Sequence, residues 1–372
     1  MQYHNIPGKT TVKAEIIKAI KRDQVGHAQL FFGEEGNGVM PIVRATLQYM
    51  SCKNPSDSDS CGVCTNCKQI QALSHPDLHF FFPIPGGQEH SRHKYLGTFT
   101  EAHKTSPHLS LNDWFKAAQL ERKQAIINVK QSEEIARAAQ LEAYSGGNKY
   151  LVIWIPERLH TTASNKLLKL LEEPPARTYF FLISIKAESL LDTIRSRCQK
   201  MFIPPYSHSE IHSYLQQENI EPSLAKSAAE LSEGNLSLAL QYAQQSEELL
   251  QNAQAFKVWS RACYTANSAA IMDWVEESAR LNRDHIKLLL TSFMKTIGVS
   301  FHSQYKQQMG NLSLYEAVKF DLGKLAPFIS INNTPRIHAL LEQALYDIQR
   351  NVNPKIVLFD TSIKMSRLLR QA

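Results

Sequence analysis

The sequence predicts an α/β domain with a parallel sheet of the P-loop type, followed by a small helical region and an all-α domain. Three observations predict this organisation. Short apolar segments alternate with helical segments up to about residue 200, as in sheets whose strands are joined by crossover helices. A glycine-rich loop separates the first apolar segment from the next helix. From about residue 247 onward the chain is helical with few breakers.

The first part of the chain contains the expected strands and helices in alternation. Residues 150–155 and 179–184 are uninterrupted apolar runs, which favour strands buried on both faces of a parallel sheet. Pro41 suits the first turn of the helix after the glycine loop. The other expected elements are helices at 11–22, 131–144 and 162–171 and short strands at 27–32 and 126–129.

A stretch rich in Gly, Pro, Ser and His interrupts this alternation at about residues 83–122. It shows little periodicity, so its composition favours an inserted, partly mobile surface segment. The spacing of its histidines fits no metal motif. These histidines are His90, His93, His103 and His108.

We expect three regions with boundaries near residues 205 and 246. Residues 1–205 form the α/β domain, and residues 206–246 form short helices with a turn at Gly234-Asn235. Residues 247–372 contain two apolar stripes at helical spacing, which predict the core of a helical bundle. The stripes are Ile286, Leu289, Leu290, Phe293, Met294 and Ile297, and Ile337, Leu340, Leu341, Leu345 and Ile348.

Composition and charge narrow the class of protein without deciding it. The 372 residues are 43% hydrophobic and 20% charged, as in globular proteins that bury large cores. A net charge of +6 is compatible with nucleic acid but too diffuse to indicate it. No apolar run approaches the ~18 residues of a membrane span. The first residues lack the apolar segment of a signal peptide, so we expect a cytoplasmic location and no membrane partner.

The glycine loop has the spacing of a phosphate-binding loop but lacks its functional side chains. Gly33, Gly36 and Gly38 stand where G-x-x-x-x-G-K-[ST] and its surroundings require glycine. Val39 and Met40 replace the lysine and the hydroxyl residue. Backbone N–H groups there could hold an anion weakly. Magnesium-dependent hydrolysis of ATP is not expected.

Four of the six cysteines form a cluster with metal-ligand spacing. Cys52, Cys61, Cys64 and Cys67 offer four thiolates, enough to close a tetrahedral structural zinc site within residues 50–70. An iron–sulfur cluster, which favours a fourth Cys three residues on followed by Pro, and unligated thiols are the alternatives. Cys198 and Cys263 stand alone and are expected to be packing residues.

Several motifs together resemble a known family. The segment His27–Gly33, the cysteine cluster, Leu171-Glu172-Glu173-Pro174-Pro175 and Ser196-Arg197-Cys198 occur in the order found in bacterial clamp-loader subunits. These proteins belong to the AAA+ superfamily and act in the DNA polymerase III holoenzyme. The resemblance covers about residues 5–245. It implies an AAA+ nucleotide-binding-like domain, a helical lid at 206–246 and an oligomerising collar at 247–372.

Compared with the motor subunits of this family, the chain differs at three places. Motor subunits have an intact P-loop, and an Asp-Glu pair at the end of the following buried strand. That pair is replaced by Trp154 and Ile155. Glu157 could be a displaced acid, but a surface charge is favoured. The lid arginine of the motors is replaced by Ser237 after Gly234-Asn235-Leu236. The resemblance therefore implies a subunit that does not hydrolyse ATP.

The resemblance also implies a role for the Ser196-Arg197-Cys198 motif. In the clamp-loader family this arginine crosses the subunit interface and reaches the γ-phosphate of ATP bound by a neighbour. A guanidinium group is permanently charged and can donate two hydrogen bonds to phosphate oxygens at once. The resemblance therefore makes Arg197 the expected trans arginine finger. Arg195 is expected only to shape the local field. The alternative for Arg197 is a surface arginine in a salt bridge.

The implied partners are those of the clamp loader. They are the gamma/tau motor subunits and the delta subunit, and, through the complex, the sliding clamp and primer-template DNA. The chain would then be an accessory subunit of the polymerase rather than an enzyme by itself. Two other functions remain open: an ATP-hydrolysing motor subunit, and a zinc-containing DNA-binding module. The second is disfavoured because Lys53 and Lys68 are the only basic residues within 50–70.

Overall fold

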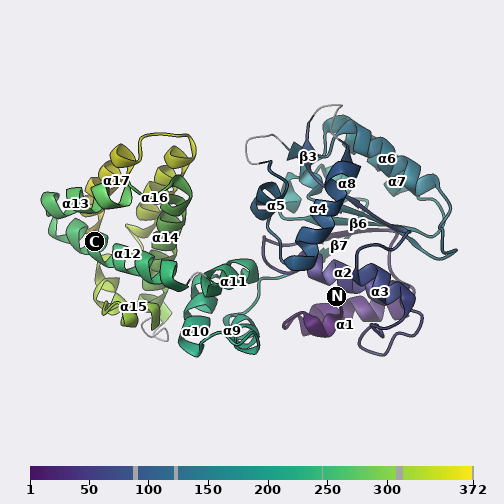
Figure 1. Cartoon of the computed structure of the whole chain (residues 1–372), viewed down its shortest axis with the longest axis horizontal. Helices are drawn as coiled ribbons and strands as arrows, with labels where there is room; N and C mark the ends of the chain where they lie inside the picture. Colours follow the sequence, from purple (N-terminus) through teal and green to yellow (C-terminus); the bar gives the residue numbers. More distant parts are fainter. Residues whose placement is uncertain (87–90, 121–124, 245, 307–312, 371–372) are drawn as a thin grey trace. The chain divides into compact units, whose positions relative to one another are not determined.

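The computed structural model describes residues 1–86, 91–120, 125–244, 246–306 and 313–370 (Figure 1). These residues form two compact units. Residues 1–210 together with 234–237 make the first unit, and residues 211–233 with 238–372 make the second. The first unit contains all the described strands, and the second is helical (Figure 1).

The first unit is built around a parallel five-stranded sheet of order β2-β5-β6-β1-β7. Every residue of β5 is buried, which explains its unbroken apolar run. Strand β1, next to the edge strand β7, pairs with β6 on one side and with β7 on the other. The parallel sheet predicted from the sequence is therefore confirmed. Its strands are β1 Ala28–Phe32, β2 Leu78–Phe81, β5 Lys149–Trp154, β6 Thr178–Ser184 and β7 Gln199–Phe202.

Helices cover both faces of this sheet. Alternate residues of each strand point to opposite faces, so Phe31 joins one core cluster and Leu30 the other. The first cluster is shared with α1, α2, α4 and α5, and the second with α6, α7 and α8. Figure 1 shows α6 and α7 side by side, away from α1 and α2. The helices are α1 Thr10–Lys21, α2 Val39–Ser51, α3 Thr65–Gln71, α4 Arg92–Thr105, α5 Leu111–Ala117, α6 Val129–Gln140, α7 Thr161–Glu172 and α8 Asp192–Arg195.

The prediction of a surface segment at residues 83–122 is wrong. This segment contributes β3 Ile84–Pro85, which pairs antiparallel with β4 Ala125–Ile126, and the helices α4 and α5. Phe99 is fully buried and stacks on Phe82 with ring centroids 4.0 Å apart. The buried residues of α4 are three or four positions apart and include His103. Because the helix is rich in polar residues, its composition did not indicate a core helix. His90 lies outside the described residues.

A buried arginine connects this segment to the cysteine region. Arg44 of α2 has no acidic partner among the described residues, and its Nη1 donates to the carbonyl of His103 at 2.6 Å. Its Nη2 approaches the carbonyl of Gln71 at 3.4 Å. These carbonyls lie at the ends of α4 and α3, where unpaired carbonyls concentrate partial negative charge. The helix ends therefore offset the buried charge, although burial lowers the pKa of Arg44 to about 10.

Several boundaries also differ from the sequence prediction. Helix α2 begins at Val39 rather than at Pro41. Helix α6 ends at Gln140, four residues before the predicted end, because Leu141 adopts an extended backbone. Strands β2 and β7 were not predicted. Both have only four residues; His79 interrupts the apolar sequence of β2, and the edge strand β7 is largely exposed.

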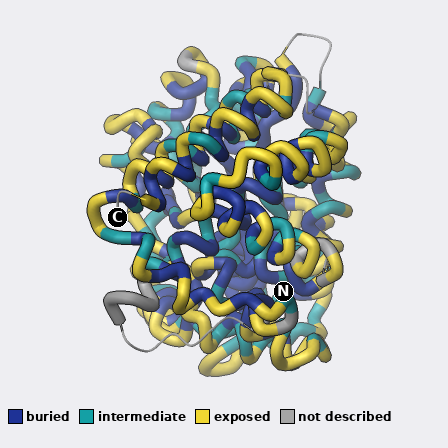
Figure 2. Tube along the Cα trace, turned by 90° about the vertical axis from the view of Figure 1, so that its left-hand side faces the viewer, coloured by how far each residue is buried: buried dark blue, intermediate teal, exposed yellow. Residues whose placement is uncertain are grey.

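The second unit has a core of long helices. Phe256 and Trp259 of α12 pack against Phe293 of α14, and the Trp259 and Phe293 rings stack at 4.9 Å. The bundle core predicted from the two apolar stripes is confirmed, and Figure 2 shows buried and exposed residues alternating along the helices. None of the described helices is long and apolar enough to span a membrane. These helices are α9 His208–Gln217, α10 Pro222–Leu231, α11 Leu236–Gln244, α12 Ser246–Thr265, α13 Ser268–Ser278, α14 Arg283–Lys306, α15 Ser313–Ala317, α16 Thr334–Gln349 and α17 Pro354–Leu369.

Candidate functional site

The four clustered cysteines converge on one point. Cys52 caps the end of α2, Cys67 lies in α3, and all four sulfur atoms lie within 4.8 Å of one another. The sulfurs of Cys61 and Cys67 are 3.9 Å apart, close to the edge of about 3.8 Å in a tetrahedron with Zn–S bonds of ~2.3 Å. The cluster can therefore hold one metal ion.

Backbone N–H groups in the same loop point at the sulfurs. The N–H of Cys61 lies 3.2 Å from the sulfur of Cys52, and the N–H of Cys64 lies 3.4 Å from that of Cys61. Burial opposes ionisation, but N–H donors from Lys53 and Cys67 hold the pKa of the Cys64 thiol at about 6. Such donors favour the thiolate, which is the form that binds metal.

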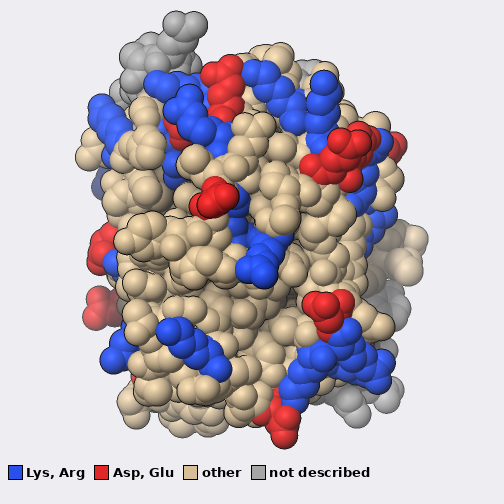
Figure 3. Space-filling model, turned by 90° about the vertical axis from the view of Figure 1, so that its right-hand side faces the viewer, with Lys and Arg blue, Asp and Glu red and all other residues tan. Residues whose placement is uncertain are grey.

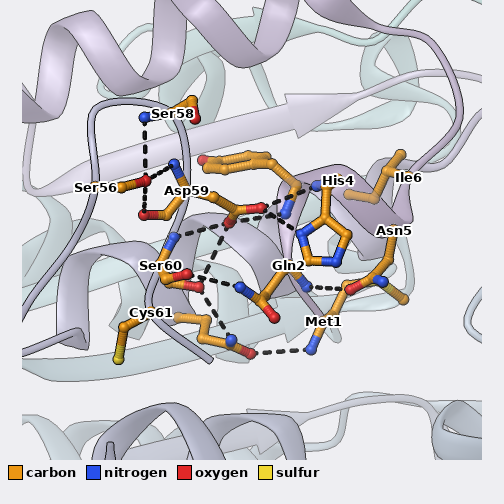
Figure 4. Close-up of polar contacts among 12 residues, drawn as sticks. Met1, Gln2, His4, Asn5, Ile6, Ser56, Ser58, Asp59, Ser60 and Cys61 are labelled. Carbon is orange, nitrogen blue, oxygen red and sulfur yellow. Dashed lines mark hydrogen bonds and ion pairs between the residues drawn. The ribbon is translucent and has the colours of Figure 1, made fainter. Parts of the chain in front are cut away.

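The loop that carries Cys61 is fastened to the N-terminal segment by Asp59 (Figure 4). The carboxylate accepts the N–H groups of Tyr3 and His4, each at 3.0 Å, and that of Ser60 at 2.8 Å. Burial works against its charge, yet the N–H donors of His4 and Tyr3 keep the pKa of Asp59 below its ordinary value. This contact could not be predicted from the sequence, because its partners lie more than 50 residues away along the chain.

Other parts of the same unit pack against the glycine loop between β1 and α2. Gly36 and Gly38 have φ of +80° and +84°, which glycine adopts without strain. A Cβ on Gly36 would collide with the side chain of Asn235, and one on Gly38 would collide with the hydroxyl of Tyr206. The N–H of Leu236 donates to the carbonyl of Gly36 at 3.2 Å. Asn235, Tyr206 and Leu236 therefore pack closely against the loop.

The space beside this loop is small. A cavity of about 30 Å³ remains there, whereas ligand pockets commonly measure ~300–1,000 Å³. Val39 and Met40 from α2 meet Trp154 and Ile155 from the end of β5 around this cavity. The structure thus brings together the four residues that stand in place of the lysine, the hydroxyl and the acidic pair.

Two further features mark the end of β5. Ile155 has a left-handed backbone with φ of +58°, which is a strained conformation for a β-branched residue. Glu157 is half-buried, and its Oε1 accepts the N–H groups of Ile185 and Lys186 at 2.9 and 3.0 Å. The favoured interpretation of Glu157 as a surface charge is wrong: its carboxylate holds the turn after β6.

The Ser196-Arg197-Cys198 motif forms the turn between α8 and β7. Arg197 is one-third exposed, and its Nε lies 2.6 Å from Oε1 of Glu172 at the end of α7. Its Nη1 donates to the carbonyl of Thr193 at 2.8 Å. The hydroxyl of Ser196 donates to the same carbonyl at 3.2 Å. Cys198 is buried, and burial raises the pKa of its thiol to about 11, as expected of a packing residue.

Sequence reasoning included Glu172 only as part of a motif and did not pair it with Arg197. The salt bridge considered for Arg197 is present, and the side chain still reaches the surface. Arg195 pairs with Asp192 in α8. On the face drawn in Figure 3, Lys and Arg lie in separate groups with Asp and Glu between them, so that face has no continuous basic surface.

Residues 8–207, more than half of the chain, match the model of a family described as DNA polymerase III, delta subunit. The chain belongs to this family. Its similarity to the delta-prime subunit of Escherichia coli K12 is 29% identity over 250 residues, which cover 65% of this chain and 63% of the relative. For the delta-prime subunit of Bacillus subtilis 168, the identity is 27% over 66% of this chain and 62% of the relative. The chain thus spans less than two thirds of the length of these delta-prime relatives.

Among solved structures, a DNA polymerase III gamma-subunit-related protein from Thermotoga maritima aligns over 96% of this chain and 100% of its own, with 14% identity and a TM-score of 0.47. The resemblance to bacterial clamp-loader subunits that the motifs carry is confirmed by the family model and by these relatives, which are delta-prime subunits. The predicted parallel α/β fold and the convergence of the four cysteines are confirmed as well.

We predict that Asp59→Asn lowers the free energy of unfolding of the first unit by about 1–3 kcal/mol, because an amide meets several N–H donors with one acceptor oxygen fewer. Urea unfolding followed by circular dichroism measures this change. Asp57→Asn on the same loop is the matched control: the Asp57 side chain is fully exposed, and its loss should leave stability nearly unchanged.

The effect should depend on pH. The pKa of folded Asp59 lies below its ordinary value of 3.8, so the ionised carboxylate contributes its full stabilisation above that pH. The advantage of the wild type over Asp59→Asn then shrinks as the pH falls through the lowered pKa. An equal loss of unfolding free energy in Asp59→Asn and Asp57→Asn, at any pH, would contradict the role of Asp59 in holding the cysteine loop to the N-terminal segment.

Proposed function

We propose that this chain is a non-hydrolysing delta-prime subunit of the DNA polymerase III clamp loader. The observation that carries the proposal is the small space beside the glycine loop, about 30 Å³, where Val39, Met40, Trp154 and Ile155 supply no charge and no metal ligand. The subunit would assemble with gamma/tau motor subunits and a delta subunit. The complex would load the sliding clamp onto primer-template DNA with ATP bound by the motors.

Apolar side chains occupy the positions that ATP hydrolysis requires. An active site of this class uses a lysine on the β- and γ-phosphates, a hydroxyl on Mg²⁺ and acids that orient metal and water. Val39 and Met40 supply neither charge nor ligand, and Trp154 and Ile155 supply no carboxylate. A triphosphate placed there would lose its hydration without gaining a charged partner, which is unfavourable.

We propose that Arg197 acts as an arginine finger in trans. Its guanidinium is one-third exposed at a turn of the α/β unit, and it is charged at any physiological pH. It could therefore reach phosphate oxygens of a nucleotide held by a neighbouring motor subunit. Ser196 and Cys198 would shape the turn, since one bonds to the backbone of α8 and the other is buried.

The remaining regions would serve assembly. We propose that residues 1–205 form the AAA+ domain, 206–246 the lid and 247–372 the collar that oligomerises. Contacts of Tyr206, Asn235 and Leu236 with the glycine loop support a scaffold role. These residues hold the loop in place where a nucleotide would hold it in a motor subunit.

The cysteine cluster would bind zinc in a structural role. Four sulfur ligands close the tetrahedron and leave no position for water or substrate. Because the ligands come from the end of α2, a loop and α3, the energy of metal binding would stabilise that part of the fold.

We predict one zinc ion per purified chain by metal analysis. Cys61→Ser should lose this zinc and lower the thermal stability, because three thiolates no longer close the site. Cys263→Ser, which alters a buried cysteine of the second unit, should keep the metal. Iron in place of zinc, or full metal content in Cys61→Ser, would overturn the assignment.

We predict that Arg197→Ala, in a complex reconstituted with gamma and delta subunits, slows hydrolysis at the neighbouring motor site by about 10³-fold or more. Single-turnover hydrolysis and clamp loading on primed DNA measure the effect. Arg197→Lys should not restore the rate, because an ammonium lacks the planar fork. Arg195→Ala, which removes a nearby arginine paired with Asp192, is the control and should be close to wild type. Wild-type rates in Arg197→Ala would refute the finger role.

A further inference from the structure

The side chain of Arg197 is held from two directions by its own chain. Nε and Nη2 both contact the same carboxylate oxygen of Glu172, and Nη1 donates to the carbonyl of Thr193 at 2.8 Å. Guanidinium has five N–H donors. Three of them meet acceptors within the described residues, so two remain for an acceptor from outside the chain.

The backbone that carries the Glu172 side chain is well anchored. Glu172 is the last residue of α7, and the preceding Leu171 is buried in the core of the sheet. The carbonyl of Leu171 accepts a hydrogen bond from Nε2 of His27 at 2.8 Å, just before β1. The end of α7 is thereby tied to the start of β1, an inner strand of the sheet. Glu172 thus presents its oxygen from a backbone that cannot easily shift.

The pair has the properties of an orienting contact. An arginine side chain has several rotatable bonds, and ordering it on binding is entropically costly. The Glu172 and Thr193 contacts select one direction before any partner arrives. Both side chains of the pair are partly exposed to solvent, so the ion pair is weak and does not compete strongly with a phosphate.

We propose that Glu172 is a positioning residue for Arg197: it holds the guanidinium side-on and leaves its other donors directed outward for a phosphate of the neighbouring subunit. This inference rests on the proposed finger role and deepens it. Glu172 touches neither nucleotide nor reacting atoms. It acts only through Arg197.

The test compares Glu172→Ala and Glu172→Gln in the complex reconstituted with gamma and delta subunits. Without the carboxylate, the finger must be ordered during the reaction, so Glu172→Ala should lower the single-turnover rate at the neighbouring site by about 3- to 30-fold. The KM for ATP should not change, because the motor subunit binds the nucleotide. Glu172→Gln keeps a carbonyl oxygen for Nε and Nη2, and it should recover most of the rate.

A double mutant separates positioning from a structural role. Because Glu172 acts through Arg197, adding Glu172→Ala to Arg197→Ala should lower the rate no further. Glu173→Ala, which removes the neighbouring exposed acid of the same motif, is the matched control and should behave as wild type. Thermal melting of each variant checks that the fold is retained.

The outcomes distinguish this inference from the finger role on which it rests. A large loss in Arg197→Ala with no loss in Glu172→Ala would leave the finger in place and overturn the positioning role. A faster Glu172→Ala would overturn it too, and would make the carboxylate a competitor of the phosphate. An equal loss from Glu172→Ala in the presence and absence of Arg197 would assign it a structural role. No loss in Arg197→Ala would overturn both.

Discussion

Apolar side chains stand at the positions where an active phosphate-binding loop and its neighbouring strand need a lysine, a hydroxyl and an acidic pair, and the proposed function depends on that replacement. The sheet and the glycine loop are intact, including two glycines with positive φ. Met40 from α2 and Trp154 from β5 both line the cavity of about 30 Å³ that remains beside the loop. Because Asn235 and Tyr206 pack on the loop from outside, its shape needs no ligand to support it. A rigid α/β unit without its own nucleotide is the physical basis of the proposed scaffold role.

Both surface features of the α/β unit are held by short polar networks rather than by hydrophobic packing alone. Asp59 fastens the cysteine loop to the N-terminal segment through backbone N–H groups. At the turn after α8, Glu172 fastens Arg197, and the end of α7 is tied to β1 through His27. In each case a carboxylate orders a segment that lies outside the sheet. The sheet is the rigid part of the unit, and the two carboxylates hold the cysteine cluster and Arg197 in place beside it.

Much of the fold could be predicted because its central strands are buried on both faces. The unbroken apolar runs at β5 and β6 follow directly from that burial. The cysteine cluster was equally predictable, since close spacing along the chain already brings three sulfurs near one another. Helix α4 escaped prediction because histidine and other polar residues interrupt its buried aromatic face, which Phe99 occupies. The pairing of Glu172 with Arg197 spans 25 residues and depends on how α7 and α8 pack, which no local pattern encodes.

Titration of the isolated chain with Mg·ATP tests the central claim most directly, by equilibrium binding and by turnover on the same sample. Because the space beside the glycine loop is small, we expect no saturable binding of Mg·ATP up to about 1 mM, which corresponds to a binding free energy weaker than about −4 kcal/mol. We also expect no release of phosphate. Micromolar, magnesium-dependent binding accompanied by phosphate release would show that the isolated chain binds and hydrolyses ATP. That result would contradict the role assigned to Val39, Met40, Trp154 and Ile155.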